Sequence, residues 1–394
     1  STNSMIEIPV YLDHHSTTPL DPGVFDAMRP FFSERFGNAA SIHHSLGREA
    51  QVACEHAREQ VATFVDATPN EIIFTSGATE SNNLAIKGVA RMNQRKGKHL
   101  VTITTEHPSV LDPVKRLARE GWQVTILPVD QQGLVDLQKV EDSLNDQTIL
   151  LSVMLANNET GVLQPLKEIA EICDRKGVLL HSDVTQAVGK IPDTTALQAC
   201  HILSFTAHKT YGPKGIGALC IRRRRPAIRI EPLFDGGGHE KNLRSGTLPV
   251  PSVVGFGHAC AIAMAEIVPE SMRIGKLRDR LYHGICSQVS DVTLNGHAQQ
   301  RLPGNLNLSF DHVDGEALMM NMQQVAVSSG SACSSVHPEP SHVLLALGIS
   351  EEQARASLRF GIGRFNTEPE IDFSISEVAE AVTRLRTMST PPKP

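Results

Sequence analysis

Between residues 70 and 221 the chain alternates between short strand-like runs and amphipathic helical stretches, and this alternation restricts the fold more than any other feature. Strands that alternate with helices form crossover units, so we predict an α/β protein with a mostly parallel sheet and helices on both faces. The runs rich in Val, Ile and Leu are 71–75, 99–104, 123–129, 148–156, 178–182, 202–206 and 217–221. The helical stretches are 48–64, 81–93, 108–119, 137–144 and 166–175.

After residue 262 the pattern changes to a predicted helix at 266–289, shorter strands around 305–309 and a last helix near 377–386. A chain of 394 residues can build more than one core. We therefore predict a large domain formed by residues 17–262. Residues 1–16 and 263–394 would form a smaller α+β domain.

Composition excludes several function classes. The net charge of −6 gives no electrostatic footprint for nucleic acid or an anionic membrane. We identify no apolar stretch that approaches a membrane span, and residues 1–16 lack the apolar core of a signal peptide. The seven cysteines are scattered without a CxxC pair, which indicates neither a metal site nor a disulfide framework. We expect a cytoplasmic, reduced protein without nucleic-acid or membrane partners.

Ligands of parallel sheets bind beyond the carboxyl ends of the strands, so the residues that follow each predicted strand are the first candidates. Ala78 and Thr79 lie in a run of small and hydroxyl residues between a strand and a helix, where free N–H groups can bind phosphate. An ordinary helix cap explains the same residues equally well. His107 also follows a strand and, taken alone, could be structural. Asn158 lies in a run of polar residues that either forms a turn or contacts a ligand.

Asp183 and Lys209 extend this series along the sheet. Asp183 comes directly out of a buried run, and a buried carboxylate needs a cationic or hydrogen-bonding partner. Gln186 follows about one helical turn later, and Lys209 comes after the strand 202–206. A phosphate site, an aspartate and a lysine at successive strand ends are the groups that pyridoxal 5'-phosphate requires. The aspartate would keep the ring nitrogen protonated, and the lysine would form a Schiff base and later transfer protons.

Cys333 lies in the run Val-Ser-Ser-Gly-Ser-Ala-Cys-Ser-Ser at 327–335, without a bulky apolar neighbour. Cysteines that serve in packing usually have apolar surroundings. We therefore expect a surface loop with a reachable thiol, the alternative being an incidental exposed cysteine. A reachable thiol and a cofactor lysine together favour a thiolate that attacks a substrate activated by the cofactor.

These segments together resemble the cysteine desulfurases of the NifS/IscS type, in the class V aminotransferase-like branch of fold-type I pyridoxal-phosphate enzymes. The resemblance runs nearly end to end and is carried by 11–13, 75–83, 105–107, 157–159, 183–186, 207–217, 244–247, 328–334 and 357–360. It includes three departures. Thr206 stands where serine is common, and Asp13-His14-His15-Ser16 lacks the usual aromatic residue after the aspartate. The sequence also ends soon after Arg386, without the longer tail that in many of these enzymes helps to dock the iron–sulfur scaffold.

The resemblance implies a role for each matching residue. Lys209 would be the Schiff-base lysine, His107 would stack on the cofactor ring, and Asp183 would pair with the pyridine nitrogen. Gln186 and Asn158 would contact the ring hydroxyl side and the substrate, and Arg359 would bind the substrate carboxylate. Cys333 would be the nucleophile that becomes a persulfide. The phosphate would be held by Ala78, Thr79, Thr206 and His208, with Thr247 supplied by the other subunit of a homodimer.

We therefore expect conversion of L-cysteine to L-alanine, with sulfane sulfur left on Cys333 and passed to an acceptor or iron–sulfur scaffold protein. Two alternatives stay open on the residues alone. One is a pyridoxal-phosphate lyase that acts on selenocysteine, cystine or cysteine sulfinate. The other is a non-catalytic protein that binds the cofactor and serves in interactions.

Overall fold

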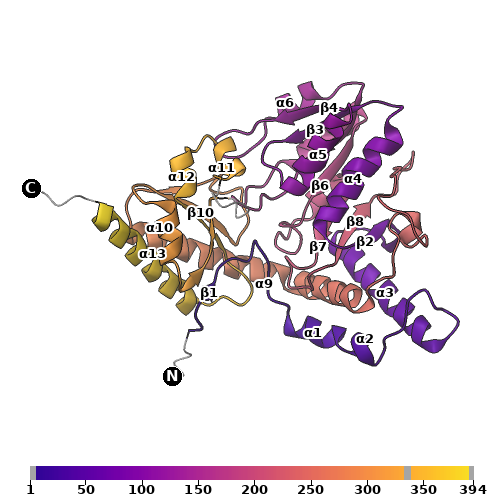
Figure 1. Cartoon of the computed structure of the whole chain (residues 1–394), viewed down its shortest axis with the longest axis horizontal. Helices are drawn as coiled ribbons and strands as arrows, with labels where there is room; N and C mark the ends of the chain where they lie inside the picture. The colour runs from indigo at the N-terminus through magenta and orange to yellow at the C-terminus, as the bar shows by residue number, and fades with distance from the viewer. Residues whose placement is uncertain (1–5, 332–338, 390–394) are drawn as a thin grey trace, which may run out of the picture.

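The computed structural model describes residues 6–331 and 339–389, and its largest element is a seven-stranded sheet (Figure 1). The strand order is β2-β8-β7-β6-β5-β3-β4. Only β8 runs antiparallel to its neighbours, and the remaining pairs are parallel. The mostly parallel α/β sheet expected from the sequence is confirmed. Its strands are β2 (Ile72–Thr75), β3 (His99–Ile103), β4 (Gln123–Leu127), β5 (Thr148–Ser152), β6 (Leu179–Asp183), β7 (Ile202–Thr206) and β8 (Gly217–Ile221).

Helices cover both faces of this sheet because its strands are apolar on both sides. On β2, Ile72 and Phe74 enter one core, whereas Ile73 enters the other. The core around Ile73 is formed with α4 (Ala78–Asn93) and α5 (Pro108–Arg119). The opposite core is formed with α3 (Ser45–Phe64), α6 (Leu137–Ser143), α7 (Leu166–Lys176) and α8 (Thr195–Ala199).

A second core lies around a four-stranded antiparallel sheet, in the order β12-β13-β10-β9. Val10 and Leu12 from the N-terminal segment are buried in it, since β1 (Val10–Tyr11) pairs with β11 (Val325–Ala326). The strands of the sheet are β9 (Val292–Leu294), β10 (Asn305–Phe310), β12 (Ser328–Ser329) and β13 (Ser357–Gly361). The helices of this half are α10 (Gly315–Asn321), α11 (His342–Ala346), α12 (Glu351–Arg355) and α13 (Glu368–Ser389).

The two cores are connected by α9 (Val250–Gln288), a helix of 39 residues. Its first half contributes Phe256 and Cys260 to the large-sheet core, and its second half contributes Leu281 and Ile285 to the other core. It begins 16 residues before the predicted start at 266, because its first half is almost uniformly apolar and lacks the periodicity of an amphipathic helix. The predicted domain boundary between residues 262 and 263 therefore falls inside a continuous helix. Two short helices, α1 (Pro22–Met28) and α2 (Pro30–Ser33), precede α3.

Within the described residues, α9 is the one helix long and apolar enough to cross a membrane by length and composition. This corrects the sequence-based statement that no apolar stretch approaches such a length. The buried core helix of a globular domain can have the same length and composition. Here 44% of the most apolar window is buried inside the chain, and the helix takes part in both cores.

Candidate active site

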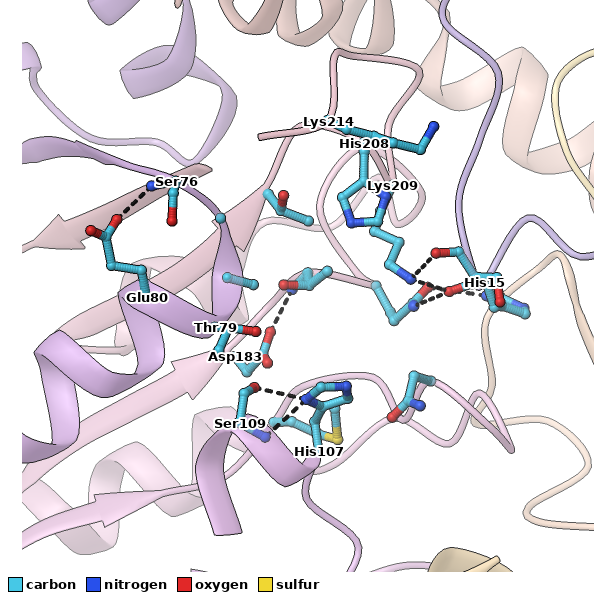
Figure 2. A pocket seen from close by; sticks show the side chains of 18 of the residues that line it. His15, Ser76, Thr79, Glu80, His107, Ser109, Asp183, His208, Lys209 and Lys214 are labelled. Atoms are coloured by element: carbon cyan, nitrogen blue, oxygen red, sulfur yellow. Dashed lines mark hydrogen bonds between the residues drawn. The ribbon is translucent and has the colours of Figure 1, made fainter. Parts of the chain in front are cut away.

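A pocket of about 590 Å³ opens at the carboxyl ends of β6 and β7, and most of the predicted site residues line it (Figure 2). This is the edge of the sheet where ligands of parallel sheets are expected. The N-terminal segment and β13 close it from the other half of the chain. The predicted residues in its lining are Ala78, Thr79, His107, Asn158, Asp183, Gln186, Thr206, His208, Lys209 and Arg359.

The start of α4 forms a site for an anion at one end of the pocket. No side chain caps this helix, whose N-cap is Gly77, so the N–H groups of Ala78 and Thr79 remain available to a ligand. Gly77 has φ +155°, and a Cβ atom there would lie 3.8 Å from Thr206 Oγ1, which also lines the pocket. Burial, together with Lys209 and Lys214, lowers the pKa of His208 to about 4, so His208 is neutral near pH 7. Free helix N–H groups, a hydroxyl and an imidazole fit a phosphate group.

Asp183 is the last residue of β6 and is almost fully buried. Asn82 Nδ2 donates to its Oδ2 at 2.9 Å, and the backbone N–H of Thr185 donates to its Oδ1 at 3.0 Å. Hydrogen bonds to the ionised form allow a carboxylate to stay charged in a buried place. Asp183 therefore presents an oriented carboxyl group to a cationic group in the pocket.

His107 is the N-cap of α5 and is connected to Asp183 through two side chains. The N–H of Ser109 donates to His107 Nδ1 at 3.1 Å, and Ser109 Oγ lies 2.7 Å from the same nitrogen. Asn82 Nδ2 donates to Ser109 Oγ at 2.9 Å as well as to Asp183. Burial lowers the pKa of His107, and Asp183 opposes this effect. Since Nδ1 accepts, the ring proton of the neutral imidazole lies on Nε2.

Lys209 follows β7, and its Nζ donates to the carbonyl oxygens of His15 and Ser16, the latter at 2.5 Å. Burial lowers its pKa to about 8, with Arg359 adding to this effect and Asp13 and Asp183 opposing it. An ordinary lysine has a pKa near 10.4 and is almost entirely protonated at neutral pH. The site therefore increases the fraction of neutral, nucleophilic amine.

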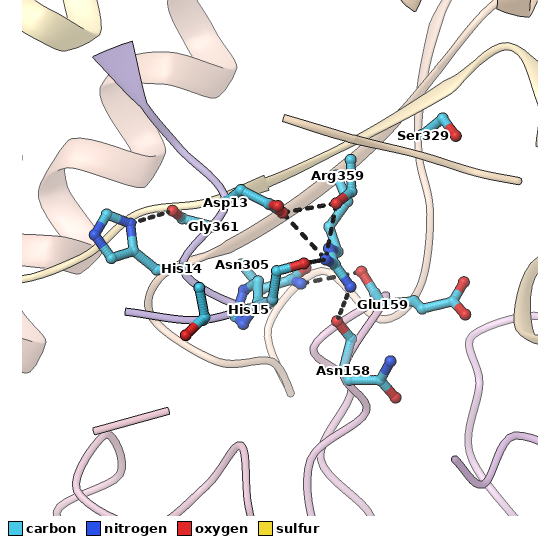
Figure 3. A network of polar contacts seen from close by, with 12 residues as sticks. Asp13, His14, His15, Asn158, Glu159, Asn305, Ser329, Arg359 and Gly361 are labelled. Atoms are coloured by element: carbon cyan, nitrogen blue, oxygen red, sulfur yellow. Dashed lines mark hydrogen bonds and ion pairs between the residues drawn. The ribbon is translucent and has the colours of Figure 1, made fainter. Parts of the chain in front are cut away.

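Arg359 projects from β13 towards the loop that carries Asn158 (Figure 3). Its Nη1 donates to the Asn158 carbonyl at 3.0 Å, and its Nη2 forms an ion pair with Asp13 at 3.1 Å. Its Nε is buried without a partner among the described residues. A largely buried guanidinium with an unused donor suits a carboxylate.

Two predicted residues are not placed in this pocket. Thr247 is exposed and does not line it. Cys333 lies outside the described residues. The described part of the chain contains no group of three or more His, Cys, Asp or Glu side chains that could hold a metal ion.

The structure also adds residues that the sequence reasoning did not assign. His15, Ser16, Ser109, Met154 and Lys214 line the pocket, and Asp13 holds Arg359. For Asp13, His15 and Ser16, the sequence signal was that residues 13–16 depart from the family pattern. Nothing local in the sequence indicates that this segment lies against Lys209, almost 200 residues later.

Fold and site together define a pyridoxal-phosphate enzyme of the class V aminotransferase type, and the model of the family "Aminotransferase class-V" matches residues 10–373. The cysteine desulfurase IscS of Anaeromyxobacter dehalogenans (strain 2CP-C) is 51% identical over 384 residues, which cover 98% of this chain and 95% of that protein. Among solved structures, a NifS-like protein matches with a TM-score of 0.89 and 35% identity, covering 96% of this chain and all of that one.

A further structure, described as "SspA in complex with cysteine", matches with a TM-score of 0.79 and 35% identity over 91% of this chain and all of that one. The chain thus belongs to the pyridoxal-phosphate-dependent cysteine desulfurases of the NifS/IscS type. The family recognised from the sequence is confirmed.

Proposed function

We propose that this protein converts L-cysteine to L-alanine and leaves the sulfane sulfur on Cys333 as a persulfide. The observation that carries the proposal is one pocket that brings together Lys209, Asp183, His107 and Arg359 beside an uncapped helix N-terminus. The desulfurase relatives name the reaction, and the pocket contains groups suited to holding the cofactor, binding an amino acid and moving protons.

Pyridoxal phosphate is the cofactor of this family, and the pocket fits it. Ala78, Thr79, Thr206 and His208 would hold its phosphate, Asp183 its ring nitrogen, and Lys209 would bind it covalently. When bound, it supplies an electron sink for the negative charge that forms at the substrate Cα.

The chain's own residues would then bind the substrate and move its protons. Arg359 would bind the substrate carboxylate, and the Asn158 loop, which it also contacts, would limit the position of the amino acid. Lys209 Nζ, which has a lowered pKa, would take the proton from the substrate Cα. His107 would carry its proton on Nε2, from which it could donate to a leaving group.

Replacing Asp183 by asparagine is expected to lower kcat for L-cysteine by about a hundredfold or more, because preorganised charge at a reacting site is worth that much. The free energy of unfolding should change far less, since asparagine keeps the shape of the side chain. Steady-state alanine formation and urea unfolding measure the two effects. Asp193→Asn, which changes an exposed carboxylate bonded to Thr195, is the control. A kcat of the D183N enzyme within a few-fold of the wild-type value would show that Asp183 has only a structural role.

The described cysteines support the choice of Cys333 as sulfur carrier. Cys54, Cys173, Cys200, Cys220 and Cys260 are buried, and burial raises the pKa of each thiol. Cys286 is exposed, yet partial burial of its thiol still raises the pKa. A thiol with a raised pKa contains little thiolate and is a poor nucleophile at neutral pH.

The residues that follow the Cys333 segment contact two loops that contribute residues to the pocket. Ser331 and Pro340 form a β-bridge, which brings the two ends of the segment together. Ser341 Oγ donates to Glu159, the neighbour of Asn158, and His342 Nε2 lies 2.9 Å from the carbonyl oxygen of Glu106, the neighbour of His107. Ser341 and His342 are thus held beside the neighbours of two residues of the proposed site.

We propose further that the active form is a homodimer, because Thr247 is exposed on a segment tied to the anion site. Arg244 Nε donates to Glu80 Oε1 at 3.0 Å, which connects this segment to the start of α4. Large apolar side chains exposed over residues 25–52 offer a surface for a second copy. They are Phe25, Phe32, Phe36, Ile42, Leu46 and Val52.

Thr247→Ala is expected to weaken cofactor binding by about tenfold, the effect of one hydrogen bond to a charged group. Sedimentation velocity should show wild type and variant as dimers alike, and the cofactor dissociation constant should be higher for the variant. A fully active monomer would contradict the dimer proposal.

The protein is proposed to act in the cytoplasm and to pass the sulfur to an acceptor or iron–sulfur scaffold protein. The proposed function as a whole is tested on the purified protein by its visible absorption spectrum with and without L-cysteine, followed by assays of alanine and sulfide. We expect a yellow protein, a spectral change on adding L-cysteine, and alanine and sulfide in equal amounts with excess reductant. Bound cofactor without alanine formation would refute the proposed activity.

A further inference from the structure

A second, smaller cavity of about 40 Å³ adjoins the active-site pocket, because His15 and Lys209 line both. It contains two charged groups to which the proposed function assigns no role, Lys190 and Glu270. The hydroxyl of Thr210, another lining residue, has no hydrogen-bond partner within the described chain. This polar space lies directly beside the amine of Lys209.

Lys190 fixes the orientation of the Gln186 side chain. Lys190 Nζ donates to Gln186 Oε1 at 3.1 Å, so the amide turns its oxygen towards the amine. The same oxygen lies 3.1 Å from His15 Nδ1, which must therefore carry the ring proton. The opposite nitrogen, His15 Nε2, is buried without a partner in the described part of the chain.

Gln186 and Lys209 meet at one backbone carbonyl. Gln186 Nε2 donates to the His15 oxygen at 3.0 Å, and Lys209 Nζ donates to the same oxygen. A continuous series of hydrogen bonds thus runs from Lys190 through Gln186 and His15 to the amine of Lys209. A group that orients the Gln186 amide therefore also orients the His15 carbonyl, which accepts a hydrogen bond from the Lys209 amine.

The two lysines also interact through charge. Burial lowers the pKa of Lys190 to about 7, with Lys209 and Arg359 adding to this effect and Glu270 opposing it. Two amines in one poorly solvated place titrate as a coupled pair. Burial lowers the pKa of the four histidines near the pair, His14, His15, His107 and His208, and it raises the pKa of Tyr211, which lines the same cavity. The remaining charges near Lys209 are those of Asp13 and Asp183.

We propose that Lys190 is a positioning residue for Lys209: it holds the Gln186 amide and, through it, the His15 carbonyl that receives the amine, and in its protonated form it disfavours a second positive charge on that amine. The proposal rests on the proposed function in one respect, that Lys209 is the amine that reacts. It explains why a lysine occupies a cavity that an apolar side chain could fill.

Three variants separate charge from hydrogen bonding. Lys190→Arg keeps a positive charge at every pH. Lys190→Gln keeps a hydrogen-bond donor without the charge, and Lys190→Met keeps neither the donor nor the charge. The matched control is Lys167→Met, which removes an exposed lysine of α7 that pairs with Asp193 at the surface. Each protein is purified with its cofactor bound.

The visible absorption of the bound cofactor, titrated with pH, reports protonation at the Lys209 nitrogen, and the acid limb of kcat/KM is recorded in parallel. A permanent positive charge disfavours protonation of Lys209, so K190R should have a lower midpoint than K190M and K190Q, by about one pH unit or tenfold in proton affinity. K190M should also raise the KM for L-cysteine above that of K190Q, because Gln186 loses its donor. K167M should titrate like wild type.

Equal midpoints in K190R, K190Q and K190M would overturn the proposal, whatever their activities, since a merely structural lysine would not shift the titration. The two hypotheses fail separately. Shifted midpoints without alanine formation would contradict the desulfurase function and leave the coupling of Lys190 to Lys209 in place. Full alanine formation with unshifted midpoints would contradict the coupling of Lys190 to Lys209 and leave the desulfurase function in place.

Discussion

Lys209→Ala protein is expected to lose L-cysteine turnover by at least about 10³-fold, because it lacks both the covalent attachment of the cofactor and the amine that takes the Cα proton. The structure supports this magnitude: Lys209 Nζ is buried, has a pKa of about 8, and rests on the carbonyls of His15 and Ser16. Within the described residues the other lysine that lines the pocket is Lys214, which is exposed and lies beside His208 in Figure 2.

The measurement combines alanine formation with reduction by borohydride and peptide mass spectrometry. In the wild type, reduction should fix the cofactor to the peptide that contains Lys209. In the variant, no peptide should carry it, and Lys167→Met should behave as the wild type does. Stable borohydride-dependent attachment of the cofactor in Lys209→Ala protein would show that the assignment is wrong.

Cys333→Ser protein is expected to keep its fold, its cofactor and its spectral response to L-cysteine. It should lose persulfide formation by at least about a hundredfold, since a hydroxyl is far less ionised and less nucleophilic towards sulfur than a thiol. The described cysteines offer no substitute, because five are buried and the pKa of Cys286 is raised as well. Substrates with a better leaving group than thiolate could still be cleaved in this variant.

Protein incubated with sulfur-35 cysteine and digested without reductant locates the sulfur. We expect the labile label on the peptide that contains Cys333, and unchanged labelling in the control Cys286→Ser, which removes the exposed thiol of α9. Label on the Cys54, Cys173 or Cys286 peptide, and none on the Cys333 peptide, would refute the proposed route of sulfur.

The strand-end residues could be predicted because their signal is local. Asp183 and Lys209 each follow a short apolar strand, and the parallel sheet brings such ends to one edge. The anion site at Ala78 and Thr79 was visible as a run of small residues before a helix, although an ordinary cap explained it as well. In the structure no side chain caps α4, which argues against an ordinary helix cap at this position.

The contacts of Arg359 with the N-terminal segment could not be predicted from neighbouring residues in the sequence. Arg359 was assigned by family resemblance alone, and its contacts with Asp13 and the Asn158 carbonyl join residues that are far apart in the chain. The start of α9 was missed for a different reason. Its first half is buried on most sides, so its apolar residues show no helical period.

By itself, the amino-acid sequence determined the α/β class, the family and the order of chemical groups along the sheet, because strand patterns and motif residues are encoded by near neighbours. Only the tertiary structure decided which charges meet. Lys190 is four residues from Gln186, yet its effect on Lys209 passes through His15, 171 residues before Gln186. The physical reason is that burial and Coulomb interactions depend on distance in space, and chain folding sets that distance.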